Sequence, residues 1–307
     1  MPLTAAITNI ARGSLHDGPG VRTVVYFKGC ALRCRWCHNP ETLERGREIL
    51  FLQSKCIHCG HCVMVCPAHH VIRGKDVEFL REGCAACGKC AESCPAGALS
   101  LCGEKKSLEE VFAEVRKDSH YYARSGGGVT LSGGECLLQP EFAGALLEKC
   151  RAHGIGTAIG SALFIPWENV ERVEKVTDWF FLDFKHPDSE AHRQWTGQGN
   201  ERILENIRRL SRLVEGRITI RIPMIPGVND TPETLENFGA VISTFGAGVS
   251  GVELLRYNHL AESKYRIAGR EYRAFAREPQ PEETILAHCA RLQSVLPERI
   301  RVFTKIG

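Results

Sequence analysis

Apolar and polar positions alternate along this chain with two periods, one typical of strands and one of helices. Short runs rich in β-branched and aromatic residues predict strands; they cover 21–28, 128–134, 155–159, 179–185, 217–223 and 251–257. Longer segments with apolar residues on one helical face predict helices; they cover 107–118, 140–154, 166–176, 200–214, 231–245 and 281–296. Repeated β–α units of this kind predict a parallel barrel or a doubly wound sheet.

Local signals mark the ends of two of the helices. Ser107 and Glu110 have the spacing of a capping box, in which each side chain accepts a hydrogen bond from the other residue's backbone N–H. Pro140 stands near the start of the next helix and Gly154 just past its end, where these residue types are favoured. We therefore expect helices to begin beside Ser107 and Pro140.

Polar residues and glycines stand where several of the predicted strands end. In parallel α/β folds the active site lies at the carboxyl ends of the strands. A tight turn or a solvated strand end explains any one of these residues, but not why so many share one rim. We therefore expect the following residues to form the active site: Cys30, Gly133, Gly134, Glu135, Asp183, Lys185, Arg221 and Asn258.

Composition narrows the class of protein. The chain has 307 residues, of which 43% are hydrophobic and 24% charged, as is ordinary for soluble globular proteins. Its net charge of +3 gives no reason to expect binding to nucleic acid or to a membrane surface. No apolar run reaches the roughly 18 residues that span a bilayer, and the first residues lack a signal-peptide pattern. We therefore expect a cytoplasmic protein.

The fifteen cysteines point to metal, because the cytoplasm keeps thiols reduced and disfavours disulfides. Eleven of them fall into three tight groups, and two groups repeat the pattern C-x2-C-x2-C-x3-C-P 28 residues apart. Bacterial two-cluster ferredoxins have this pattern, and the fourth cysteine of each run binds the other cluster. Zinc also binds C-x2-C pairs, but two identical runs ending in proline favour iron–sulfur. One 4Fe–4S cluster then takes Cys56, Cys59, Cys62 and Cys94, and the other takes Cys84, Cys87, Cys90 and Cys66.

The third group, Cys30, Cys34 and Cys37, supplies only three thiols. A cubane held by three cysteines has one iron open to an outside ligand, as catalytic metal sites do. C-x3-C-x2-C with an aromatic residue, Trp36, before its last cysteine resembles the signature of radical S-adenosylmethionine (SAM) enzymes. The resemblance implies that SAM fills the open position and is cleaved to methionine and a 5′-deoxyadenosyl radical. The alternative is a fourth ligand from elsewhere and a cluster that only stores electrons.

A glycine-rich stretch at 131–136, "LSGGEC", counts against that alternative. It is similar to the G-G-E-P element of the same superfamily, which holds the amino group of SAM. The resemblance implies this role for Gly133, Gly134 and Glu135. Cys136 stands in the proline position, where we expect it to matter for packing and not as a metal ligand.

Four longer stretches resemble the activating enzymes of glycyl radical enzymes: 16–42, 125–142, 182–186 and 221–230. The likeness covers essentially the whole chain. It implies a partial (β/α)6 TIM-like barrel with an inserted small ferredoxin-like domain. The barrel would start in 1–51, which carries the cluster loop, and continue in 103–307. The insert, 52–102, would hold two 4Fe–4S clusters, which makes three clusters in all.

The same resemblance implies which residues contact SAM. Asp183 and Lys185 match a D-x-K motif at the SAM site, and Arg221 matches an arginine near the SAM carboxylate. Trp36 and His38 lie beside Cys37, on the adenine side of the cluster loop. SAM and the clusters are therefore the expected cofactors.

Three further positions follow from the family pattern. Asp17, in "HDGPG", stands where the family meets the glycyl loop of its protein substrate, so we count it with the three cysteines as catalytic. Asn258 takes the place of a histidine found in other members, and we expect it, and not His259, at the SAM site. Gly160 replaces an acidic residue that helps relatives to bind a monovalent cation, so we do not carry that cation site over.

Together these features predict an oxidoreductase that cleaves SAM and abstracts a hydrogen atom from a backbone glycine of a separate glycyl radical enzyme. A flavodoxin or ferredoxin would supply the electrons, and the chain would act as a monomer. One alternative is a radical SAM enzyme that modifies a different peptide or a small molecule. The other is an electron carrier with no chemistry of its own.

Overall fold

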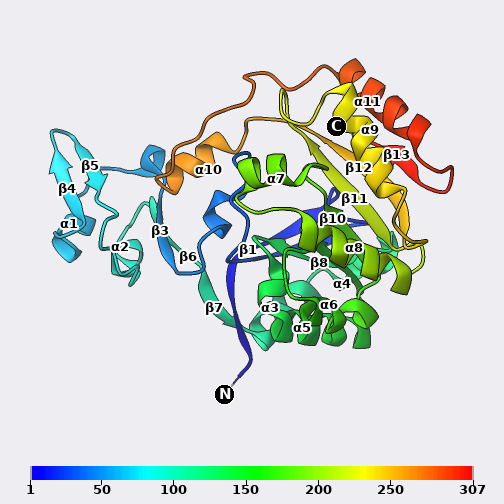
Figure 1. Ribbon diagram of the computed structural model, residues 1–307. Coiled ribbons are helices and arrows are strands. Elements are labelled where there is room, and N and C mark those ends of the chain that lie inside the picture. Colours follow the sequence, from blue (N-terminus) through cyan, green and yellow to red (C-terminus); the bar gives the residue numbers. More distant parts are fainter. Residues whose placement is uncertain (1, 306–307) are drawn as a thin grey trace.

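The computed structural model describes residues 2–305, and a nine-stranded sheet forms its centre (Figure 1). Two antiparallel strands, β7 (Glu104–Ser107) and β1 (Thr4–Ser14), form one edge of this sheet. Seven strands follow in parallel: β2 (Arg22–Phe27), β8 (Gly128–Gly133), β9 (Gly156–Ser161), β10 (Trp179–Asp183), β11 (Ile218–Met224), β12 (Val249–Arg256) and β13 (Arg301–Phe303). The fold is mixed α/β with a parallel sheet, as the alternating pattern predicted.

Helices follow the parallel strands, and their apolar faces join the strand residues in one large core. The helices of this layer are α3 (Leu108–Arg116), α4 (Ser119–Ser125), α5 (Pro140–Ala152), α6 (Trp167–Glu171), α8 (Glu201–Leu213), α9 (Pro232–Ile242) and α11 (Glu282–Val295). The helix expected over 166–176 is shorter than predicted: it ends at Glu171, and a separate 3-10 turn follows at Glu174–Val176. Within residues 2–305, none of the helices combines the length and the apolarity needed to cross a membrane.

The predicted helix boundaries are confirmed at both positions that carried a signal. Ser107 Oγ accepts a hydrogen bond from the Glu110 N–H at 3.3 Å, and the Glu110 carboxylate accepts one from the Ser107 N–H at 2.7 Å. Pro140 is the first residue of α5, and Gly154 follows its end with a left-handed φ of +69°. A side chain is rarely tolerated at that φ, so glycine suits the position.

Residues 48–102 form a small unit to one side of the main sheet, drawn in cyan tones in Figure 1. Strands β3 (Glu48–Phe51) and β6 (Leu99–Cys102) pair at its base. Beyond them lie α1 (His61–Val65), a hairpin of β4 (His70–Arg73) and β5 (Asp76–Phe79), and α2 (Lys89–Glu92). A separate apolar cluster fills this unit; its buried members are Ile49, Cys62, Val77, Cys90 and Leu99.

The sequence duplication in this unit extends to its backbone. His58 and Ala86 occupy the same position in the two cysteine runs, and both have a positive φ, +57° and +48°. Gly60 and Gly88 are also equivalent, with φ of +75° and +91°, and each precedes one of the short helices. Positive φ is uncommon for residues other than glycine, so its recurrence at one position indicates that both runs form the same loop.

Candidate active site

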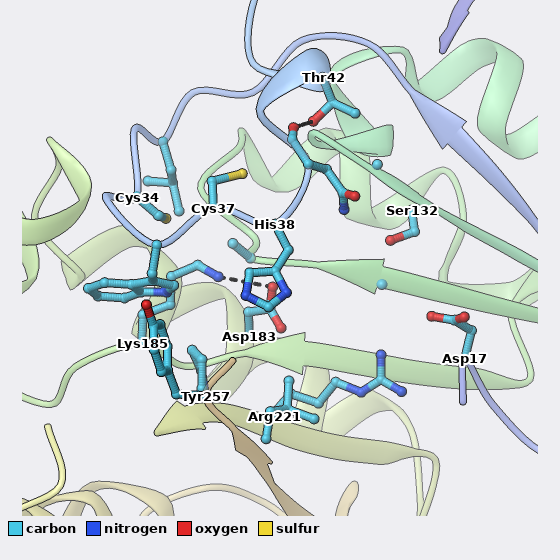
Figure 2. A pocket seen from close by; sticks show the side chains of 18 of the residues that line it. Asp17, Cys34, Cys37, His38, Thr42, Ser132, Asp183, Lys185, Arg221 and Tyr257 are labelled. Carbon is cyan, nitrogen blue, oxygen red and sulfur yellow. Dashed lines mark hydrogen bonds and ion pairs between the residues drawn. The ribbon is translucent and has the colours of Figure 1, made fainter. Parts of the chain in front are cut away.

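A cavity of about 630 Å³ lies at the carboxyl ends of the parallel strands. Figure 2 shows Cys34 and Cys37 at one side of it and Asp17 and Arg221 at the other. Of the thirteen residues predicted to act in catalysis or SAM binding, all but Glu135 line it. The lining residues are Asp17, Cys30, Cys34, Trp36, Cys37, His38, Gly133, Gly134, Asp183, Lys185, Arg221 and Asn258.

The three-cysteine loop follows β2 and is fixed by backbone hydrogen bonds. At its start, the Gly29 N–H donates to the Thr42 carbonyl at 2.7 Å. In its middle, the Arg33 N–H donates at 2.7 Å to the carbonyl of Thr196, the last residue of α7 (Ser189–Thr196). The loop is therefore held between a turn of its own and a helix that precedes α8 in the chain.

Two glycines let β8 end directly against this loop. A Cβ at Gly133 would lie 2.3 Å from the Phe27 backbone nitrogen, and one at Gly134 would lie 2.3 Å from the Gly29 carbonyl oxygen. Neither contact is possible for a residue with a side chain. The "SGG" sequence thus places bare backbone beside the start of the cluster loop.

The chemistry of the three thiols suits an iron–sulfur cluster more than a single ion. Burial raises the pKa of Cys30 and Cys34 to about 12, so each thiol would release a proton on binding metal. Among residues 2–305 no three His, Cys, Asp or Glu side chains converge on one point where an ion could sit. In a cubane each cysteine binds a different iron, so such convergence is not required.

A row of charged residues crosses the sheet at the cavity. In the parallel register Asp183 of β10 stands beside Arg221 of β11, and Arg221 stands beside Glu253 of β12. Lys185 Nζ lies 3.0 Å from Asp183 Oδ2. Burial by itself lowers the pKa of Lys185, but the charge of Asp183 and then that of Cys34 raise it above the ordinary lysine value. Lys185 is therefore a buried cation next to the cluster loop.

Glu253 and Lys305 are site residues that the sequence did not reveal. Glu253 is 2% exposed. Its carboxylate accepts a hydrogen bond from Arg221 Nε at 2.8 Å and forms an ion pair with Lys305 Nζ at 3.4 Å. Arg221 and Lys305 also both donate to the backbone carbonyl of His16, at 3.0 and 3.2 Å. One carboxylate thus orients two cations that hold the segment before Asp17. The only signal in the sequence was a single acidic residue in the apolar run "GVELL".

The "HDGPG" segment reaches into the cavity before β2. Asp17 Oδ2 accepts a hydrogen bond from Ser14 Oγ at 2.5 Å, and the Asp17 carbonyl accepts one from Thr130 Oγ1 at 2.8 Å. Gly20 has a φ of +66°, and a Cβ there would lie 2.5 Å from the Ser125 carbonyl oxygen. The chain can make this close turn only with glycine, and the turn directs Asp17 to the cavity.

The structure places Glu135 behind the cavity wall. Its carboxylate is 2% exposed and accepts hydrogen bonds from Ser161 Oγ at 2.8 and 2.9 Å, from the Ala162 N–H at 3.1 Å and from the Leu137 N–H at 3.2 Å. Burial raises its pKa to about 7, although these hydrogen bonds oppose the rise. Cys136 beside it is fully buried.

His38 and Asn258, which are 220 residues apart, meet at the cavity. His38 Nε2 lies 3.2 Å from the Asn258 carbonyl oxygen. His259 does not line the cavity, whereas Asn258 does. Trp36 is 4% exposed and packs edge-on against Phe275, with the ring centroids 6.0 Å apart.

The cysteines of the small unit are grouped across its two repeats. A narrow second cavity is lined by Cys56, Cys59 and Cys62 of the first run together with Cys94 of the second. In the other group, burial and then the charges of Cys66 and Cys84 raise the pKa of Cys90 to about 11, because these residues are close neighbours. The first grouping joins the four cysteines expected to share one cluster, and the crossed assignment of the eight ligands stays a prediction.

Three family models match the chain. The radical SAM superfamily matches residues 81–238, a 4Fe–4S dicluster domain matches 55–99, and a 4Fe–4S single cluster domain matches 16–64. These matches support iron–sulfur clusters and SAM as cofactors.

Curated relatives resemble the chain over most of its length. The (2S)-3-sulfopropanediol dehydratase activating enzyme of Klebsiella oxytoca is 40% identical over 87% of this chain and 86% of its own. The trans-4-hydroxy-L-proline dehydratase activating enzyme of Clostridioides difficile is 39% identical over 98% of both chains. A radical SAM methyltransferase structure from Sphaerobacter thermophilus shares the fold, with a TM-score of 0.52 and 13% identity over 99% of this chain and 78% of that one. The chain belongs to the radical SAM superfamily and, within it, to the activating enzymes of glycyl radical enzymes, which are oxidoreductases.

Proposed function

We propose that this chain holds a 4Fe–4S cluster on Cys30, Cys34 and Cys37, binds SAM against it, and generates a radical on a backbone glycine of a partner glycyl radical enzyme. The observation that carries the proposal is the convergence of twelve predicted residues from separate strand ends on one cavity. Tight turns and solvated strand ends alone would not bring three thiols and a buried lysine to the same space.

When bound, the cluster supplies the electron that breaks a C–S bond of SAM, giving methionine and the 5′-deoxyadenosyl radical. Cys30, Cys34 and Cys37 would hold the cluster, and with three thiolates it would have a position free for SAM. Arg221, oriented by Glu253, binds the carboxylate. Lys185, kept protonated by Asp183, offsets the negative charge of the thiolates. The radical then takes the Cα hydrogen of the glycine, which leaves 5′-deoxyadenosine and a glycyl radical.

The remaining residues shape the binding space. The backbone at Gly133 and Gly134 accommodates the amino group of SAM, since bare backbone lies beside the cluster loop there. Trp36 and His38 border the adenine. For Glu135 we propose an indirect part in SAM binding: its carboxylate holds Ser161 and the backbone of residue 162, which line the cavity.

We further propose a partial (β/α)6 barrel formed by 1–51 and 103–307, with 52–102 inserted as a ferredoxin-like domain that carries two more 4Fe–4S clusters. The crossed grouping of Cys56, Cys59, Cys62 and Cys94 around one small cavity supports the insert. So does the repeated loop conformation at His58 and Ala86. With the cluster on the barrel, the protein would carry three clusters.

An external protein must supply the electrons, and we propose a flavodoxin or ferredoxin that reduces the insert clusters, which relay electrons to the SAM cluster. Exposed apolar side chains on the first repeat, Ile57, Met64 and Ile72, support an entry point there. The chain would act as a monomer in the cytoplasm, where its fifteen unpaired cysteines would remain reduced.

The test is to reduce the reconstituted protein anaerobically with SAM and the glycyl radical enzyme encoded beside it. Electron paramagnetic resonance should show the doublet of a glycyl radical, and deuterium at that glycine should pass into 5′-deoxyadenosine. An Asp17→Asn variant should lose partner activation while it still binds SAM. If no encoded partner gains a radical while a small molecule or another peptide is modified, the enzyme acts on a different substrate.

A further inference from the structure

His70 is a buried imidazole for which the protein provides no partner. It is 1% exposed, and neither ring nitrogen has a hydrogen-bond partner among the described residues. A neutral imidazole carries one N–H donor and one acceptor. Leaving such a group unsatisfied in a protein interior is unfavourable, and nearly all buried polar groups therefore have partners. A group absent from the polypeptide itself would resolve this cost.

The duplication in the insert indicates what that group is. His70 is the fourth residue after Cys66, and its equivalent in the second repeat is Ala98, the fourth residue after Cys94. Ala98 lines the small cavity that Cys56, Cys59, Cys62 and Cys94 share. The repeats also match just before these positions, where the N–H groups of residues 69 and 97 donate to the carbonyls of the two fourth cysteines at 3.2 and 3.1 Å. By the same arrangement, His70 adjoins the other cluster.

Packing places His70 among the ligands proposed for that cluster. Its backbone N–H donates to the Cys66 carbonyl at 3.0 Å. Its ring stacks on Phe79, with the centroids 4.8 Å apart and the planes within 15°. Phe79, Cys84 and Cys90 belong to one apolar cluster of side chains. Because Phe79 covers a face of the ring, the ring nitrogens remain available at its edge.

We propose that the His70 side chain donates its N–H to a sulfur of the iron–sulfur cluster held by Cys66, Cys84, Cys87 and Cys90. This rests on the proposed function, which assigns a cluster to those cysteines. Hydrogen bonds to cluster sulfurs are one of the factors that set reduction potential. A donor stabilises the extra negative charge of the reduced cluster and so raises its potential. The Ala98 side chain offers the first cluster no such donor, so this side-chain hydrogen bond acts on the second insert cluster alone.

The experiment is a potentiometric titration of the reconstituted full-length protein, followed by electron paramagnetic resonance. His70→Ala introduces the residue that the other repeat already uses, and it should lower the potential of one cluster while leaving the other two unchanged. His70→Gln keeps an N–H donor, so the reduction potential of that cluster should lie closer to the wild-type value. His69→Ala is the matched control, because the His69 ring already bonds the Leu80 carbonyl at 3.1 Å, and it should change none of the potentials.

A second measurement can first be made on the wild-type protein, where no variant has to fold. In wild-type protein labelled with ¹⁵N-histidine, pulsed resonance of the reduced insert clusters should detect a coupled histidine nitrogen, and that coupling should disappear in His70→Ala. Full iron content, about twelve irons for three cubanes, with unshifted potentials and no nitrogen coupling would overturn the role of His70 alone. About four irons per chain would overturn the three-cluster assignment and this role with it.

Discussion

Cys30 is the residue on which the proposed chemistry depends most directly. It stands at the end of β2, and burial raises its pKa to about 12, so the free thiol is neither exposed nor reactive. Replacing it with alanine should abolish SAM cleavage, because only two thiolates would remain for the cluster. The product 5′-deoxyadenosine, measured by chromatography after reduction with dithionite, should fall to background, and about four irons per chain should be lost.

The matched control for this variant is Cys150→Ala. Cys150 is fully buried in α5 and lies outside the three cysteine groups, so its loss should leave the iron content unchanged. Continued formation of 5′-deoxyadenosine by a variant lacking Cys30, Cys34 and Cys37 together would contradict the assignment of the SAM cluster.

Glu253 provides a second test at the residue scale. It orients Arg221, which we place at the SAM carboxylate, through a contact of 2.8 Å. Glu253→Gln removes the charge, and a hydrogen bond to a charged group contributes about 1.5–3 kcal/mol. We therefore expect the KM for SAM to rise by about tenfold or more, with a smaller change in kcat at saturating SAM.

Lys305→Met is the control for Glu253→Gln, because it removes the more exposed of the two cations and leaves the Arg221 contact in place. Lys305→Met should raise the KM for SAM less than Glu253→Gln does. A lowered kcat with KM unchanged in Glu253→Gln would show that Arg221 does not act in SAM binding.

Side chains that carry the chemistry could be predicted from the sequence only where their type and spacing were informative. The cysteine spacings and the glycine pair were informative, because each encodes a local geometry. Glu253 could not be predicted, because its position beside Arg221 arises from the register of β11 and β12. For Glu135 the structure shows its carboxylate held in the cavity wall by Ser161 and the neighbouring N–H groups, and its predicted contact with SAM stays a prediction.

At the scale of elements, a strong hydrophobic periodicity was sufficient to predict a helix or a strand, and a weak one was not. The parallel strands and their long helices were predicted because each buries a continuous apolar face. β1 was missed, since its burial is mixed along its length and it is recognisable mainly by its pairing with β2. The short helices α7 and α10 (Glu262–Ile267) were missed as well, because they bury few residues. The insert was predicted from its cysteines, not from its hydrophobic pattern; the structure shows a separate apolar cluster there, and the ferredoxin-like domain stays a prediction.

The insert should be separable from SAM binding by mutation. Its cysteine ligands are complete without SAM, and its apolar cluster is distinct from the main core. A Cys56→Ala, Cys84→Ala double variant should still bind SAM at the remaining cluster but turn over poorly with a protein electron donor. Calorimetry would measure SAM binding, and 5′-deoxyadenosine formation with reduced flavodoxin would measure turnover. Turnover equal to wild type would leave the insert with a structural role only.

At the scale of the whole molecule, the small unit of residues 48–102 is tied to the rest of the chain through Glu48 and Arg81. The Glu48 carboxylate lies 2.6 Å from Lys28 Nζ, just before the loop, and 2.8 Å from an Arg270 guanidinium nitrogen. Arg81 of the insert also donates to the Ile267 carbonyl at 2.8 Å. These contacts join the insert, the start of the SAM cluster loop and the segment after β12. Such contacts would keep the proposed clusters at a fixed separation, as the proposed electron relay requires.

The two repeats of the insert differ on their outer surface. Three exposed apolar side chains of the first repeat correspond to small or polar residues in the second: Ile57 to Ala85, Met64 to Glu92 and Ile72 to Ser100. Cys59, a proposed ligand of the first cluster, is also exposed beside them. Lys55 and Lys75 are exposed nearby and pair with no carboxylate within residues 2–305. Exposed apolar side chains and unpaired positive charges on one repeat suit a small acidic electron-transfer protein.

We therefore predict that a Met64→Glu, Ile72→Ser variant slows reduction of the clusters by reduced flavodoxin about tenfold or more, since losing central apolar contacts at such an interface costs over 1.4 kcal/mol. Both new residues already occur at the equivalent positions of the second repeat, so the fold should accept them. Stopped-flow absorbance would follow the reduction.

Leu213→Glu, which changes an exposed apolar residue on α8, is the control and should have no effect. Reduction by dithionite, which needs no docking, should proceed at the wild-type rate. Equal rates with flavodoxin would remove the patch as the entry point, and a loss of partner activation under dithionite would assign it to the glycyl radical enzyme instead.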